Sequence, residues 1–249
     1  MLELFDLSIY NWGLLLFCAL LIGMSKAGVP GVSIAVIPMM AILFGGKQST
    51  GILLPILIFA DLFGVGYYHR HANWKHILRA LPWAFAGILI AMFVGKRIND
   101  QQFKTLIALI IFASLALMVR NDLKKDRASV PDHYSFVAFM GLSGGFATMI
   151  GNAAGPIFAI YLLALRLPKN EYIGTAAWFF LIINLFKLPL HLFIWKTISI
   201  PSFVLNAVTL PAIAAGAFAG IYLIKKIPVG LYRWVVIVVT FLSALLMLG

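Results

Sequence analysis

Long apolar runs, separated by short polar stretches, follow one another along the whole chain. An apolar run of about 20 residues is typical of a helix that crosses a lipid bilayer, so the pattern predicts an all-α polytopic membrane protein. Long helices are predicted at about 8–24, 50–68, 76–96, 102–120, 172–194, 201–224 and 230–248, and shorter ones at about 32–44 and ending near residue 165. A further apolar run begins near Tyr134 and is predicted to be interrupted by Gly141, Gly144, Gly145, Gly151, Asn152, Gly155 and Pro156.

The composition excludes several classes of protein. Hydrophobic residues make up 63% of the 249 residues and charged residues 11%, whereas a soluble domain carries about 25% charged residues. A soluble fold of this length cannot bury so much apolar surface, which excludes a soluble enzyme, a secreted disulfide scaffold and a disordered tail. The net charge of +11 lies in short clusters between apolar runs. This distribution is typical of cytoplasmic loops and predicts no nucleic-acid partner.

The order of the elements repeats within the chain. With a shift of 123 residues, Gly28 falls on Gly151, Gly51 on Gly174 and Asp61 on Asn184; with a shift of 129, Pro82 falls on Pro211 and Gly87 on Gly216. Matched glycines and prolines carry weight because each sets the local backbone geometry. The pattern predicts two membrane repeats of about five helices, residues 1–121 and 134–249, each opened by short glycine-broken helices and joined by a cytoplasmic linker, residues 122–133.

The basic residues indicate how the repeats lie in the membrane. If the short helices of each half form a pair that returns to its starting side, the two halves are inverted. The loops of one side then hold Arg70, Lys75, Arg79, Arg120, Lys124, Lys125, Arg127, Arg166, Lys169, Lys225, Lys226 and Arg233, and those of the other side hold Lys47, Lys96, Arg97, Lys104 and Lys196. Twelve basic residues against five favour this arrangement under the positive-inside rule, with both termini extracytoplasmic. Inverted repeats are typical of secondary transporters, whose substrate site lies at the repeat interface.

The candidate site lies at the glycine-rich breaks. Intramembrane charge is costly and marks functional positions, and a broken helix directs free N–H groups at an anion. Lys26 and Lys187 are the two lysines within apolar surroundings. The first break offers Ser25, Lys26, Gly28, Pro30, Gly31 and Ser33, and the second offers Thr148, Gly151, Asn152, Gly155 and Pro156. These groups predict an anion site, which Thr175, Trp178, Asn184 and Lys187 on the helix at 172–194 would complete.

Several of these residues have alternative interpretations. Single glycines are more typical of close helix packing than of binding, and Lys187 could extend toward the membrane surface. Asp61 could pair with Lys26 or Lys187 as a static ion pair, or could carry a coupling proton. Three loop histidines, His69, His71 and His76, are interpreted as part of a solvated face rather than as metal ligands. Cys18 is the single cysteine and has no metal partner at the usual spacing, so no metal or cofactor is predicted.

One pattern suggests an enzyme. The tetrapeptide from Gly141 to Gly144 matches the G-x-S-G motif of rhomboid intramembrane proteases, with Ser143 as nucleophile and His191 on a later helix as its base. Such a short pattern arises by chance in a glycine-rich membrane chain, and the interpretation is disfavoured. No H-E-x-x-H, Walker A or G-x-G-x-x-G motif occurs in a suitable context.

The chain resembles the TauE/SafE family of sulfite exporters and sulfonate permeases over essentially its whole length, most specifically in its second half. The resemblance rests on the segments 153–156, 174–180 and 184–187, together with the duplicated chain and its glycine-rich breaks. It implies a transporter in a prokaryotic inner membrane that moves sulfite, sulfoacetate or another organosulfonate without ATP. The predicted partners are this small anion and the lipid bilayer, and a homo-oligomer is possible. An anion channel and a purely structural membrane subunit are the alternatives to alternating access.

Overall fold

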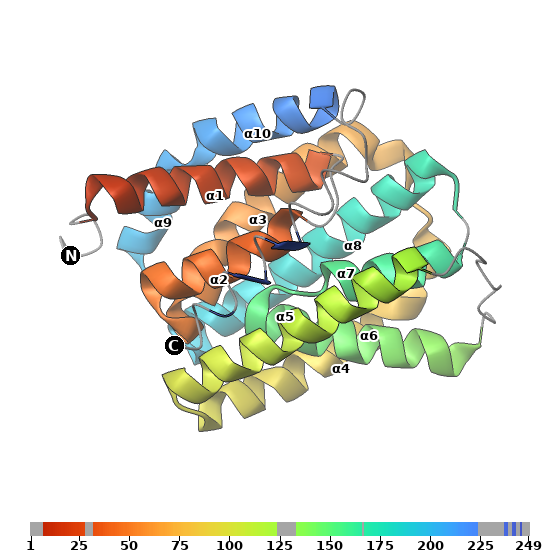
Figure 1. The fold of residues 1–249 in the computed structure, drawn as a ribbon. Coiled ribbons are helices and arrows are strands. Elements are labelled where there is room, and N and C mark those ends of the chain that lie inside the picture. Colours follow the sequence, from red (N-terminus) through yellow and green to blue (C-terminus); the bar gives the residue numbers. More distant parts are fainter. Residues whose placement is uncertain are drawn as a thin grey trace.

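A computed structural model describes residues 7–27, 32–123, 133–165 and 167–223, together with 237, 238, 241, 242 and 245. All regular elements of these residues are helices, which confirms the all-α prediction (Figure 1). In chain order the elements are α1 (Ile9–Ala27), α2 (Val32–Phe44), α3 (Gly46–Tyr68), η1 (His69–His71), α4 (Trp74–Arg97), α5 (Asp100–Leu123), α6 (Tyr134–Gly151), α7 (Gly155–Ala164), α8 (Lys169–Pro189), η2 (Leu190–Ile194), α9 (Ile200–Val208) and α10 (Leu210–Leu223). The helix predicted at 230–248 lies mostly outside the described residues.

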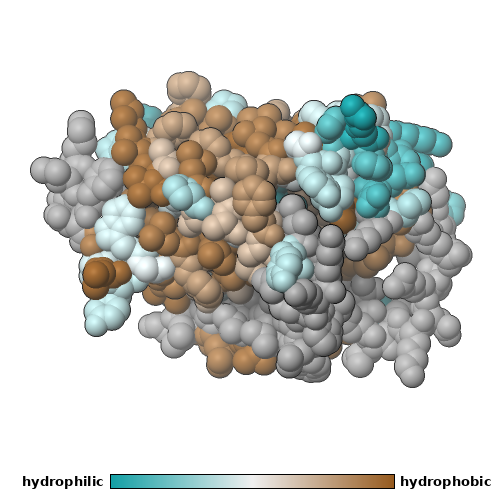
Figure 2. All heavy atoms as spheres, turned by 90° about the horizontal axis from the view of Figure 1, so that it is seen from above, coloured by the Kyte–Doolittle hydropathy of each residue, from teal (hydrophilic) through white to brown (hydrophobic). Residues whose placement is uncertain are grey.

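Five helices of the described chain are long and apolar enough to cross a membrane: α1, α3, α4, α6 and α8 with η2. The bent pair α9 and α10 raises this to six if it counts as one span, and α2 and α7 are shorter apolar helices. Large apolar side chains such as Phe193, Ile200 and Phe218 are more than 70% exposed. Figure 2 shows an apolar surface over much of one face, with hydrophilic residues gathered at one end. This distribution fits an integral membrane protein.

α1 and α10 cross closely at two glycines. A Cβ atom added to Gly23 would overlap the backbone carbonyl oxygen of Ile213, and one added to Gly216 would overlap that of Leu20. Backbones approach this closely only where small residues leave room, as in many membrane helix pairs. The crossing therefore depends on glycine at both positions.

α4 and α6 form a second crossing of the same kind. A Cβ atom on Gly145 would overlap the carbonyl oxygen of Ala84, and one on Gly87 would overlap that of Leu142. The α6 residues follow the α1 residues of the first crossing by 122 positions, and the α4 residues precede the α10 residues by 129. In Figure 1, α1 and α6 run in opposite directions. Corresponding residues of the two halves thus make corresponding contacts.

Two expectations about helix continuity are wrong. Gly141, Gly144 and Gly145 do not interrupt α6, which continues to Gly151, because Gly141 and Gly145 face α4 closely instead. The single helix predicted at 201–224 is bent by 44° between α9 and α10. Pro211, the second residue of α10, has no N–H to donate to the preceding turn, which accounts for the bend.

The glycine crossings lead to a stability prediction. Gly145→Ala is expected to lower the free energy of unfolding by about 1–3 kcal/mol, because its Cβ would overlap the backbone of α4. Gly13→Ala is the matched control, since a Cβ at Gly13 has nothing within 4 Å. Thermal unfolding in detergent micelles measures both. A Gly145→Ala midpoint equal to that of Gly13→Ala would contradict the close crossing.

Candidate functional site

Two polar side chains meet where α3 packs against α8. Asn184 Nδ2 donates a hydrogen bond of 2.6 Å to Asp61 Oδ2, and both residues are buried, at 2% and 0% exposure. The two residues are 123 positions apart and are the pair that the repeat comparison aligns. Matched positions of the two halves are therefore in direct contact inside the protein.

Lys26, in the last turn of α1, is the cationic partner of Asp61. Its Nζ lies 2.7 Å from Asp61 Oδ1, and the lysine side chain is 14% exposed. The same ammonium lies 4.3 Å from the centre of the Phe180 ring, which adds a cation–π contact. Of the two partners considered for Asp61, the structure pairs it with Lys26. The two charges cancel.

Lys187 has a different environment. Its side chain is fully buried, and its Nζ donates to Thr148 O at 3.1 Å, to Thr148 Oγ1 at 2.9 Å and to Asn152 Oδ1 at 2.7 Å. These three neutral acceptors use the three protons of an ammonium group. Within the described residues no carboxylate forms a salt bridge with Lys187. The side chain does not extend toward the membrane surface, and its three hydrogen-bond partners are neutral groups.

The break between α6 and α7 lies beside this ammonium. Asn152 adopts a left-handed backbone conformation, with φ of 55°, and its N–H caps the carbonyl groups of Ala147 and Thr148. Its side chain also donates from Nδ2 to Thr50 O on α3 at 3.2 Å. The break is thus tied both to α3 and to Lys187 on α8.

The beginning of α7 offers room and free donors. α7 begins at Gly155 with no side-chain cap; Pro156 has no N–H and Phe158 N donates to Ala154 O at 2.9 Å, so the donors at this end are the N–H groups of Gly155 and Ile157. A Cβ atom on Gly155 would meet nothing within 4 Å. The positive end of the helix dipole also lies here. Gly151, by contrast, is buried and packs near Ile107.

Other predicted site residues lie elsewhere. Ser25 and Ser33 are half-buried at the helix ends that flank residues 28–31, and Gly28 itself lies outside the described residues. Thr175 Oγ1 accepts a hydrogen bond from Asn73 N at 2.9 Å, and Trp178 Nε1 donates to His69 O at 3.3 Å.

Thr175 and Trp178 therefore hold the loop after α3 against α8. They lie two or more helical turns before Lys187, at about 5.4 Å per turn. The structure does not bring them into the polar cluster around that lysine.

The protease and metal hypotheses gain no support. Ser143 Oγ donates to Phe139 O at 2.6 Å, and the His191 ring bonds instead to Thr197 Oγ1 at 2.8 Å. No Ser–His hydrogen bond joins these two residues in the described structure. The described residues also contain no group of three His, Cys, Asp or Glu side chains placed to hold a metal ion.

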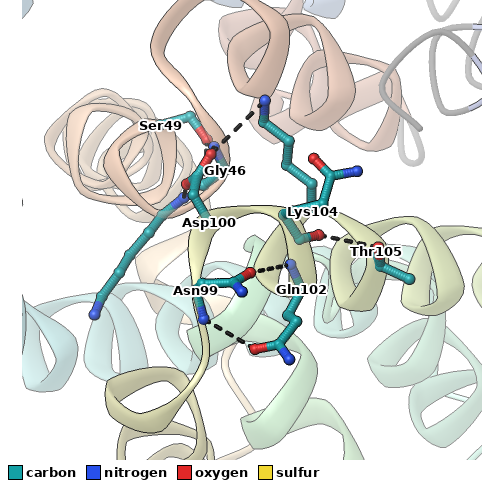
Figure 3. A network of polar contacts seen from close by, with 9 residues as sticks. Gly46, Ser49, Asn99, Asp100, Gln102, Lys104 and Thr105 are labelled. Carbon is teal, nitrogen blue, oxygen red and sulfur yellow. Dashed lines mark hydrogen bonds and ion pairs between the residues drawn. The ribbon is translucent and has the colours of Figure 1, made fainter. Parts of the chain in front are cut away.

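One polar network is not predicted by the sequence. Asp100, at the start of α5, accepts hydrogen bonds from the backbone N–H groups of Gly46 and Lys47 at 3.3 and 3.0 Å, and lies 3.7 Å from Lys104 Nζ (Figure 3). It caps α3, which has no cap of its own at Gly45. The spacing of Asp100 and Lys104 indicates a local pair, but no sequence pattern links Asp100 to a helix more than 50 residues away.

Apolar spanning helices around a buried charged cluster define a membrane protein with an interior polar site, the arrangement of membrane transport proteins. The model of the sulfite exporter TauE/SafE family matches residues 15–247, and the chain belongs to that family. The resemblance found in the sequence is thereby confirmed over nearly the whole chain. This is a family of transporters of sulfur anions, not of enzymes. No curated protein shows a significant match to the chain.

Proposed function

We propose that this protein is a secondary transporter that carries a small sulfur oxyanion, such as sulfite or an organosulfonate, by alternating access. The buried ammonium of Lys187 carries this proposal. The charges of Lys26 and Asp61 cancel, so the cluster of Lys26, Asp61 and Lys187 carries one net positive charge when Lys187 is protonated, as we propose for the state that binds the anion. A buried charge without a counter-charge is costly. A monovalent anion entering the cluster would supply the missing charge.

The beginning of α7 is the place where we expect the anion to lie. The space beside Gly155 adjoins the backbone N–H groups of Gly155 and Ile157, and Asn152, three residues before Gly155, contacts Lys187. Helix N-termini bind sulfate-like and phosphate-like groups through such N–H groups and the helix dipole. Ser25, Lys26 and Ser33, at the helix ends that flank residues 28–31, would face the same anion from the first break; Gly28, also predicted to bind it, lies outside the described residues.

The matched contacts of the two halves support an inverted repeat. The α1–α10 and α4–α6 crossings correspond residue by residue, and Asp61 meets its counterpart Asn184. Such a pair of halves can rock about a fixed central site, which exposes that site to each side in turn. The excess of basic residues in one set of loops supports an orientation with both termini outside the cytoplasm.

Asp61 is the residue to which we assign coupling. It is a fully buried carboxylate whose charge is balanced by Lys26. A carboxylate in this position can exchange its cationic partner for a proton during a transport cycle. Coupling through Asp61 predicts that an imposed pH gradient changes the rate of anion transport.

Purified protein in proteoliposomes tests the proposed function. Sulfite and a short organosulfonate are expected to enter with saturable kinetics, and acetate of the same charge is expected to compete poorly. A conformational cycle on the microsecond-to-millisecond scale limits turnover to about 10⁶ per second at the very most. Flux that stays linear in concentration and exceeds this limit would indicate a channel. If the protein neither binds nor transports any sulfur oxyanion, the proposal is refuted.

A further inference from the structure

A second buried polar cluster lies one turn beyond Lys187. Asn184, Lys187 and His191 are spaced i, i+3 and i+7 and so share one face of the α8–η2 segment. His191 is fully buried, and its ring packs edge-on against Trp195 at 5.1 Å between centroids. Its partner Thr197 lies next to Gly51 near the beginning of α3, since a Cβ on Gly51 would overlap Thr197. The polar face thus continues from the central cluster toward the end of α3 that holds Lys47.

One ring nitrogen of His191 has no partner in the described structure. Nδ1 lies 2.8 Å from Thr197 Oγ1, whereas Nε2 is buried and makes no hydrogen bond. If Nδ1 carried the proton, both the Thr197 hydroxyl proton and the Nε2 lone pair would be left unsatisfied. If the hydroxyl donates to Nδ1, only the Nε2–H lacks a partner. The second tautomer leaves fewer unpaired groups and is preferred, because each one is costly when buried.

The local backbone fixes this orientation. Leu190–Ile194 form a π turn, closed by hydrogen bonds from Trp195 N to Leu190 O at 2.9 Å and from Thr197 N to His191 O at 3.0 Å. Lys196 then adopts a left-handed conformation, with φ of 53°. The wide turn returns Thr197 to the histidine. π turns inside helices are frequent at functional sites.

The charges around the ring are positive on both sides. Lys187 lies one helical turn before His191 on the same face of this segment. The Lys47 ammonium lies 5.1 Å from the centre of the Trp195 ring, which packs against the histidine. Asp100 is the carboxylate near this end, but it is about half exposed, and the backbone N–H of Lys47 and the Lys104 ammonium bind it. A buried N–H donor between two cations suits an anion.

We propose that His191 donates its Nε2–H to the transported oxyanion at a second binding site (the second station), which lies between the central cluster and the Lys47 end of α3. The inference rests on the proposed function, because it requires that an oxyanion pass through the protein. An oxyanion offers acceptor oxygens to the imidazole N–H, as sulfite and sulfonates do. In this role His191 is a binding residue on the path, and Thr197 positions its ring.

Two substitutions separate this role from a structural one. In His191→Gln, the amide N–H takes the place of Nε2–H but the contact with Thr197 is lost; in His191→Asn, the polar group remains near Nδ1 but the distal donor is lost. The ratio kcat/KM for sulfite in proteoliposomes is expected to stay within about threefold of the parent for Gln and to fall about tenfold or more for Asn, as expected when one buried hydrogen bond to a charged ligand is lost. The reverse order, or two variants equal to the parent, would overturn the proposal.

A spectroscopic measurement on the parent protein does not depend on whether His191→Asn folds. The ¹⁵N resonance of the His191 Nε2–H, identified by its loss in His191→Gln, is expected to shift on addition of sulfite and not of chloride. An unchanged resonance in a parent that transports sulfite would refute the second station and leave the proposed function intact. A parent that neither binds nor transports any sulfur oxyanion would end both proposals.

Discussion

Lys187→Met is expected to weaken the binding of a sulfur oxyanion about a hundredfold. The substitution keeps the apolar stem and removes the buried charge that has no carboxylate partner in the described chain. A charge about 6 Å from a monovalent anion, at an effective dielectric constant of about 20, contributes about 3 kcal/mol, which corresponds to a hundredfold change in affinity. Isothermal titration of purified protein with sulfite, together with uptake into proteoliposomes, measures the loss.

Lys75→Met is the matched control for this experiment. Lys75 is exposed near the beginning of α4, where water screens its charge, so the same substitution is expected to leave sulfite affinity nearly unchanged. Size-exclusion profiles and thermal midpoints show whether both variants are folded. Equal affinity of folded Lys187→Met and parent protein would remove Lys187 from the site and with it the main support for the proposed function.

Asp61→Asn is expected to destabilise the protein by about 3–5 kcal/mol. The amide is similar in size and can still accept the hydrogen bond from Asn184, but the ammonium of Lys26 would lose its counter-charge. Removing one partner of a buried ion pair has a cost of this order because the other charge remains buried. For a chain of this length the thermal midpoint in detergent is expected to fall by about 10 °C.

A double substitution distinguishes charge from packing. In Lys26→Met/Asp61→Asn no unpaired charge remains, so most of the lost stability is expected to return, giving a coupling free energy of the size expected for a direct pair. Asp100→Asn serves as the control at a half-exposed carboxylate; the amide can retain one of its two capping contacts, and the expected effect is below about 1 kcal/mol. A double variant no more stable than Asp61→Asn would show that the ion pair does not account for the loss.

The helices could be predicted from hydropathy because each apolar run determines its own local structure. The predicted helix 76–96 corresponds to α4 (Trp74–Arg97), and 32–44 to α2 (Val32–Phe44). The sequence alone wrongly predicts that the glycines of α6 interrupt the helix, because glycine occurs both at helix breaks and where a neighbouring backbone packs closely. Only the contact of Gly145 with Ala84, distant in sequence, distinguishes the two.

The site was predicted in part. Charge within apolar runs identified Lys26, Asp61 and Lys187, and the repeat aligned Asp61 with Asn184, which the structure brings into contact. The partners of Lys187 could not be predicted, because Thr148 and Asn152 approach it through the packing of α6 on α8 rather than through any local pattern. For the same reason the sequence does not reveal that Thr175 and Trp178 bond to Asn73 and His69, away from Lys187.

The three hydrogen bonds that Lys187 already makes limit the affinity of the site for the transported anion. With every proton of its ammonium engaged by Thr148 and Asn152, the lysine attracts an incoming anion through space without gripping it directly. This long-range attraction raises the local concentration of the anion inside the protein, but leaves no short, strong hydrogen bond from Lys187 to break when the anion is released. Moderate affinity suits a transporter, because a ligand that binds too tightly would dissociate slowly and limit the rate of the transport cycle.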